Sequence, residues 1–208
     1  MSKSEGANRT GHMSLSDTPH PAKAGRGRMR TSETGQALLE FAVSVLMLLI
    51  LVFGIIDFSR AISDRQVMAQ LSREGSDLAS RSSIAAGPNV ASSLTNIAQT
   101  VASETNSLSV TSNGKIIVSM VQNTGTAGSP NCVLEGQGST GGLVATSKIG
   151  TTVGNAVTLS TCSGATPVPL PGQTVWTTEV FYSFTPITPL GNLVKIAFPG
   201  TLYDVAVF

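Results

Sequence analysis

An uninterrupted apolar segment near the start of the chain constrains its fold more than any other feature. Gln36–Ile56 reads QALLEFAVSVLMLLILVFGII and carries one charged side chain, Glu40. As an α-helix, these 21 residues would measure roughly 31 Å, which matches the hydrocarbon core of a bilayer at about 30 Å. The sequence therefore predicts one transmembrane helix at residues 36–56.

A cleaved secretory signal peptide is the competing interpretation of this segment. Its apolar region would be about 7–15 residues long and would lead into small residues at a cleavage site. Here the apolar run is longer and continues into Asp57, Phe58 and Arg60 with helical character. A retained span fits better, and the helix is predicted to continue to about Arg81 because no proline interrupts it.

The charges on either side of the span predict its orientation. Basic residues dominate before it, whereas acidic and basic residues balance after it. The basic residues that most closely precede the span are Lys23, Arg26, Arg28 and Arg30. Because basic flanks stay in the cytoplasm, we expect a bacterial inner-membrane protein with a single span. Residues 1–35 would be a basic, disordered cytoplasmic leader, residues 36–81 the transmembrane and extended helix, and residues 82–208 a periplasmic or extracellular domain.

The composition of the outer part argues against several classes of function. Charged residues make up 12% of the 208, and the net charge of +1 gives no basic field for nucleic acid. Both histidines, His12 and His20, lie in the leader, so the outer domain cannot form a Ser-His-Asp or Cys-His site. We therefore expect no enzyme, no metal site, no cofactor and no small-molecule substrate.

The outer part has the sequence pattern of a small α+β domain. Gly87-Pro88-Asn89 would break the long helix, and apolar residues at helical spacing then predict a short amphipathic helix over 90–101. An apolar stripe on the long helix is expected to dock on this domain: Ala61, Met68, Leu71, Gly75 and Leu78. Segments rich in β-branched and aromatic residues predict strands of an antiparallel sheet at 115–121, 156–162, 174–184 and 201–208.

Turn-forming residues predict the connections of this sheet. Asn113-Gly114 is a typical hairpin signal, here between 108–111 and 115–121. Stretches rich in Gly, Ser and Thr at 124–131 and 136–155 are expected to be loops.

Cys132 and Cys162 are the only cysteines. In an exported domain, an even pair favours a disulfide. It would close a loop of about 30 residues and contribute on the order of 3 to 4 kcal/mol in the chain-entropy model. Two free thiols are the alternative, and a metal site is disfavoured because the outer domain has no histidine.

Glu40 is the costly residue of the span, because a carboxylate in a bilayer is usually paired or functional. A cut after Gly35 would free an α-amino group on Gln36 that could pair with Glu40 of a neighbouring subunit. In the other interpretation, Glu40 lies close enough to the start of the helix to reach the headgroups. The residues by themselves leave both open.

The wider pattern resembles the TadE-like family of tight-adherence (Flp-type) pilus proteins. Gly35–Phe41 is similar to the family's G-Q-A-hydrophobic-hydrophobic-E-F start, and Gly54–Arg60 to its G-I-I-[DE]-F-G-R motif, with Ser59 for glycine. Ser72–Asp77 resembles A-R-E-G-A-R, and Tyr182–Leu190 resembles the closing Y-x-F-x-P segment. The motif residues of the helix are then Gly54, Asp57, Phe58, Arg60, Arg73, Glu74 and Gly75.

The resemblance implies a minor pseudopilin or pilus-assembly protein with a pilin-like outer domain. A prepilin peptidase would cut between Gly35 and Gln36, and Glu40 and Phe41 would then serve subunit assembly. The basic residues do not directly precede Gly35, as they usually do in type IV prepilins. The implied partners are this peptidase, other pilins or pseudopilins, inner-membrane assembly-platform proteins and membrane lipid. A membrane-tethered periplasmic binding or adhesion module outside any filament is the alternative function.

Overall fold

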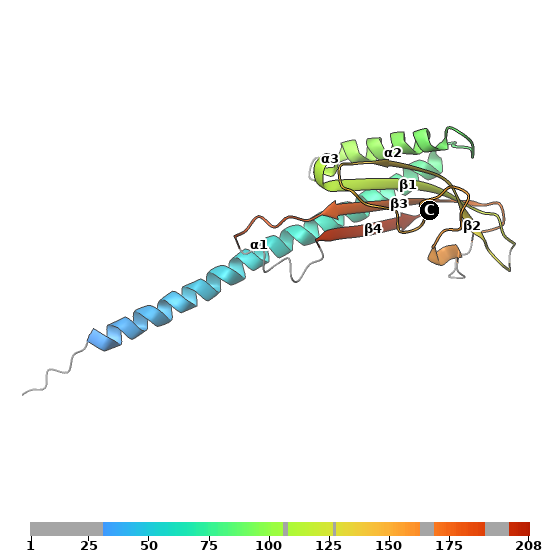
Figure 1. Cartoon of the computed structure of the whole chain (residues 1–208). Coiled ribbons are helices and arrows are strands. Elements are labelled where there is room, and N and C mark those ends of the chain that lie inside the picture. The colour runs from blue at the N-terminus through green and yellow to red at the C-terminus, as the bar shows by residue number, and fades with distance from the viewer. Residues whose placement is uncertain (1–30, 106–107, 127, 163–168, 190–199) are drawn as a thin grey trace, which may run out of the picture. The chain divides into compact units, whose positions relative to one another are not determined.

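The computed structural model describes residues 31–105, 108–126, 128–162, 169–189 and 200–208 (Figure 1). Its helices are α1 (Thr31–Arg81), α2 (Val90–Glu104), α3 (Val110–Asn113) and the 3₁₀ turn η1 (Ser160–Cys162). Its strands are β1 (Gly114–Asn123), β2 (Cys132–Thr140), β3 (Thr174–Ser183) and β4 (Thr201–Val207). The contacts divide the chain into two units, 1–44 and 45–208. The predicted α+β class is confirmed, while most of the predicted leader, residues 1–30, lies outside the described residues.

Helix α1 begins at Thr31, five residues before the expected start, and ends at Arg81 as expected. No proline lies between Thr31 and Gly35, so the backbone can remain helical there. Most of its large apolar side chains up to Ile56 are exposed, and Phe41 is 68% exposed. Among the described residues, one helix is long and apolar enough to cross a membrane, and it lies within Gly35–Arg81. Such a surface requires an apolar environment, which supports the predicted span.

The four strands form one antiparallel sheet in the order β2-β1-β3-β4. Side chains alternate between the two faces of a strand, so β1 contributes side chains to a cluster of buried residues on each face of the sheet. Ile116, Val118 and Met120 belong to the cluster that packs with the helices, and Val121 belongs to a second cluster on the opposite face.

Helices α1 and α2 cover the same face of the sheet (Figure 1), and α2 packs mainly on β2 and less on β1. The predicted helix over 90–101 is confirmed, since Val90, Leu94, Ile97 and Val101 are buried. The predicted stripe on α1 is confirmed at its first four positions, because Ala61, Met68, Leu71 and Gly75 are buried.

The last position of that stripe is wrong. Leu78 is 36% exposed, and Ala79 is fully buried in its place. A repeat of about 3.5 residues would bring Leu78 to the buried face, but a straight helix has about 3.6 residues per turn. The buried face therefore follows Met68, Ser72, Ser76 and Ala79.

The prediction of a loop over 136–155 is wrong for its first residues. Residues 136–140 are extended and paired with β1, as part of strand β2. The glycines that suggested a loop serve helix packing instead. A Cβ on Gly136 would lie 2.2 Å from Cγ1 of Val90, and one on Gly138 would lie 2.2 Å from the backbone nitrogen of Thr95. Glycine at these positions therefore lets α2 approach the strand.

The pairing of β2 shifts at one residue, where Met120 pairs with Gly136 and Val121 pairs with Leu134. Glu135 is left as the extra residue of a β-bulge, and a bulge changes which side chains face which layer. Cys132 and Leu134 thus face the second cluster, whereas the two glycines face α2.

Two further strand predictions are wrong. Residues 108–111 form no hairpin arm: Val110–Asn113 is the short helix α3, whose end is closed by the Gly114 N–H donating to the Val110 carbonyl. Residues 156–162 are not a strand, because they contain only a single bridge from Ala156 to Val133 and then η1. Their apolar side chains, Leu159 among them, belong to the second cluster rather than to a sheet ladder.

The segment 147–162 packs on the face of the sheet opposite the helices, and a disulfide fastens its end. Cys132 and Cys162 are joined with Cα atoms 5.8 Å apart, as the even cysteine count predicted. Cys132 is buried with Val121 and Leu134 of the sheet and with Ile149 of the segment. The bond thus ties the start of β2 to η1 beneath a small apolar core.

Candidate functional site

The predicted processing junction lies in the first turns of α1. Gln36, Glu40 and Phe41 are exposed, and nothing lies within 4 Å of a Cβ built on Gly35. The Gln36 side-chain amide donates to Glu40 Oε1 at 3.2 Å, and Ser44 Oγ donates to the Glu40 carbonyl at 2.8 Å. The Gly35–Gln36 bond is therefore helical but close to a helix end, where helices fray most readily.

Asp57 is fully buried at the end of the predicted span. Its carboxylate accepts the backbone N–H of Ile187 at 3.2 Å and the hydroxyl of Thr188. Both donors belong to the segment that follows β3, about 130 residues further along the chain. The two sequence motifs that were quoted separately, Gly54–Arg60 and Tyr182–Leu190, therefore meet at this carboxylate, with Leu190 itself outside the described residues.

One turn further, Arg60 and Asp64 lie half-buried beside Tyr182. Within the described part of the chain, Arg60 Nη1 and Asp64 Oδ2 are buried without a hydrogen-bond partner. Burial raises the pKa of the Asp64 carboxyl, and the Arg60 charge opposes that rise. Burial, and then the Asp64 charge, raise the pKa of Tyr182. This part of α1 thus carries polar groups into contact with the domain.

The Ser72–Asp77 motif docks α1 on β3 and β4 through small side chains. Ser72 Oγ donates to the Asp204 carboxylate at 2.5 Å, and Ser76 Oγ donates to the Ala206 carbonyl at 3.1 Å. A Cβ on Gly75 would lie 2.8 Å from the side chain of Thr178, so a larger residue would require Thr178 or the helix to shift.

The charged residues of the same motif point elsewhere. Arg73 and Glu74 are exposed, and Asp77 forms an ion pair with Arg81 at 2.8 Å. A hydrogen bond with the Glu104 carboxyl, together with burial, raises the pKa of Glu74. The remaining motif residues on the helix are the half-buried Gly54 and the exposed Phe58.

A second polar cluster on the opposite face of the sheet was missed by sequence reasoning. Glu179 of β3 is fully buried and accepts from the Ser147 hydroxyl, from the Lys148 N–H at 2.8 Å and from the Tyr203 hydroxyl at 2.9 Å. Lys148 Nζ lies 3.8 Å from the centre of the Tyr203 ring. Burial, with the Glu179 charge, raises the pKa of Tyr203. One signal for this cluster was present, namely an acidic residue within the apolar pattern of β3.

Removing the Asp57 carboxylate should detach the segment that follows β3. In Asp57→Ala, the Ile187 N–H and the Thr188 hydroxyl lose their acceptor, so we expect at least a tenfold faster hydrogen exchange at Ile187. Hydrogen exchange followed by mass spectrometry on the detergent-solubilised protein measures this. Asp77→Ala removes an exposed carboxylate from the same helix and should leave that rate unchanged. Equal exchange at Ile187 in the Asp57 variant and the wild type would contradict the contact.

Comparison with known proteins assigns the first part of the described chain. Residues 35–77 match the family model described as TadE-like protein, which covers the predicted processing junction, the predicted span and the Ser72–Asp77 motif. No curated protein and no solved structure matches the chain. The family is a component of pilus assembly, and its presence together with the exposed apolar helix fits a membrane protein associated with tight-adherence pili. The chain therefore carries a TadE-like segment at residues 35–77, in the family that its motifs indicated.

Proposed function

We propose that this protein is a minor pseudopilin or pilus-assembly protein of a tight-adherence pilus and acts by helix packing and protein–protein interaction. The proposal is supported by the different surroundings of the two parts of one TadE-like helix. Its residues up to Ile56 leave an apolar surface exposed, while Asp57, Ser72 and Ser76 bind the outer domain. The first part of the helix is thus available to lipid and to neighbouring helices, and the second part is bound to the folded outer domain.

Glu40 determines which group of a neighbouring helix α1 would pack against. An isolated carboxylate in hydrocarbon is unfavourable, so it favours an arrangement that supplies a positive partner. Cleavage after Gly35 would create such a partner, because Gln36 would then begin the chain with an ammonium group. Within one chain, Gln36 and Glu40 are one helical turn apart and already in hydrogen-bond contact. In the assembled state, the new ammonium group of one subunit would pair with Glu40 of the next.

The topology and partners follow from the same scheme. The basic leader would stay in the cytoplasm, where the prepilin peptidase cuts, and the disulfide-bonded domain would lie in the periplasm or on a filament. Other pilins and the inner-membrane assembly platform would contact the exposed apolar face of α1. Catalysis forms no part of this proposal.

The mature amino terminus tests this function. When the protein is produced with an active prepilin peptidase, intact-mass and terminal-peptide mass spectrometry should find a chain that begins at Gln36. Production without the peptidase should return the full leader and serves as the control. A full-length chain in the presence of a peptidase that cleaves a known pilin would overturn the pseudopilin role. It would favour the membrane-tethered binding or adhesion module instead.

Neutralising Glu40 should separate processing from assembly. In Glu40→Gln, the partner of the new ammonium group loses its charge, so we expect at least a tenfold drop in sheared surface pili, with cleavage after Gly35 unchanged. The matched control is Glu104→Gln, which neutralises an exposed carboxylate on α2. Normal piliation in the Glu40 variant would mean that this carboxylate only reaches the headgroups.

A further inference from the structure

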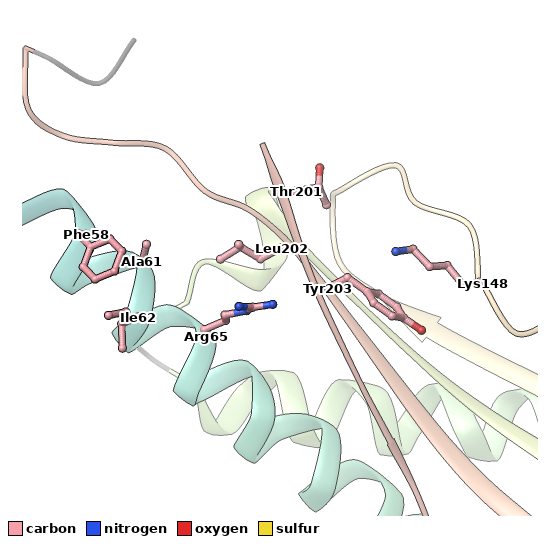
Figure 2. Close-up of a pocket in the computed structure, with 8 residues that line it drawn as sticks. All are labelled: Phe58, Ala61, Ile62, Arg65, Lys148, Thr201, Leu202 and Tyr203. Carbon is pink, nitrogen blue, oxygen red and sulfur yellow. The ribbon is translucent and has the colours of Figure 1, made fainter. Parts of the chain in front are cut away.

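An open groove of about 580 Å³ lies between α1 and the first residues of β4. Phe58, Ile62 and Arg65 of α1 form one wall, and Lys148, Leu202 and Tyr203 contribute to the other side. Figure 2 shows Arg65 extending from α1 toward β4, and Lys148 pointing toward the same strand from the loop on its other side. The lining contains two cationic side chains and no carboxylate.

The wall formed by α1 changes from apolar to cationic along the helix. Ile55, Phe58 and Ile62 are 59%, 50% and 43% exposed and lie at helical spacing with Arg65. This stripe continues the surface of the span beyond its last apolar residue, Ile56. A face that begins in hydrocarbon and ends in a cation has the polarity profile of a bilayer surface.

The depth of the groove also matches that surface. Ile62 is the last exposed apolar residue of this stripe, and Arg65 lies three residues beyond it, which places the Arg65 Cα roughly 4.5 Å further along the helix. The headgroup layer extends about 5–8 Å beyond the hydrocarbon on each side. A stripe that is embedded in lipid as far as Ile62 would therefore place Arg65 at the depth of the lipid phosphates.

Lys148 is held in place before any ligand arrives. Its backbone N–H donates to the buried Glu179 carboxylate at 2.8 Å, and its ammonium group lies 3.8 Å from the centre of the Tyr203 ring. Within the described residues, neither Lys148 nor Arg65 forms an ion pair. Two positive charges from separate elements thus line one groove, and none of the residues that line it is a carboxylate.

We propose that this groove binds an anionic phospholipid, with the phosphate between Arg65 and Lys148 and the upper acyl chain against Phe58 and Ile62. The occupant is a lipid rather than a free anion because the cationic end is continuous with the apolar stripe of the span. The proposal rests on the membrane location in the proposed function and is independent of any role in a pilus.

Native mass spectrometry of the full-length protein tests this site. The protein is reconstituted in nanodiscs of phosphatidylcholine and phosphatidylglycerol at 3:1, and the lipids that remain bound after release are identified. We expect phosphatidylglycerol to be enriched over its share of the bilayer. Arg65→Gln/Lys148→Gln should reduce that enrichment at least fivefold, whereas Arg65→Lys/Lys148→Arg should preserve it.

Matched changes elsewhere provide the control. Arg73→Gln/Lys115→Gln removes the same charges outside the groove and should leave the enrichment unchanged. Inorganic phosphate at 10 mM should not displace the lipid; displacement would identify a plain anion site and overturn the lipid proposal. Equal enrichment in the groove variant and in the control variant, or none in the wild type, would also overturn it. Failure to enter nanodiscs at all would instead contradict the membrane span of the proposed function.

Discussion

Gly138→Ala should lower the free energy of unfolding of the unit formed by residues 45–208 by about 3 kcal/mol. The added Cβ would lie 2.2 Å from the backbone nitrogen of Thr95 and 2.4 Å from the carbonyl carbon of Leu94. Both are backbone atoms of α2, so no side-chain rotation relieves the clash and the helix must shift. That shift would disturb the buried contacts of Leu94 and its neighbours, which dominate the helix-facing core.

Thermal denaturation of the full-length protein in detergent measures this effect. Trp176 is the only tryptophan and is 7% exposed in the same core, so its fluorescence reports on the fold directly. A loss of about 3 kcal/mol corresponds to a drop in melting temperature of roughly 6–12 °C for a unit of this size. Gly87→Ala is the control, because nothing lies within 4 Å of a Cβ there. A drop no larger than that of the control would show that α2 does not approach β2 this closely.

The second large effect is expected at Glu179, where alanine should cost about 3–5 kcal/mol of stability. The substitution leaves the Ser147 hydroxyl, the Lys148 N–H and the Tyr203 hydroxyl without their shared acceptor in a buried place. The loop that contains Ser147 and Lys148 should then separate from the sheet. Hydrogen exchange at Lys148 should accelerate together with the drop in melting temperature.

Glu179→Gln provides a graded comparison. Its amide oxygen can still accept from Lys148 and Tyr203, so we expect a loss between those of the wild type and the alanine variant. Glu104→Ala removes an exposed carboxylate and should change the melting temperature little. A Glu179→Ala variant as stable as Glu104→Ala would mean that the carboxylate does not hold the loop.

Sequence reasoning located the elements whose own residues specify them. The apolar span, the amphipathic stripe of α2 and the β-branched strands β1, β3 and β4 were predicted with small errors at their ends. Strand β2 was missed because its glycines have no strand preference of their own. Gly136 and Gly138 are explained by the helix above them, and that neighbour is specified only by the folded structure.

The candidate site was also predicted only in part: the sequence indicated single residues but not their partners. Asp57 was singled out as part of a local motif, but its partners, Ile187 and Thr188, lie about 130 residues away. Local periodicity carries no information about such a contact. The Arg65–Lys148 groove was missed for a related reason, because its two cations come from a helix and a loop that only the sheet brings together.

The polar contacts along α1 have a mechanical consequence. Asp57, Ser72 and Ser76 hold the domain at separate points on one helix, and the small residue Gly75 lies against the sheet between the last two. A tensile load applied along the helix axis would strain these attachments in parallel, as shear, rather than peel them apart one after another. Rupture would then require several hydrogen bonds and the packed stripe to fail together, so the domain should resist axial pulling far better than sideways displacement.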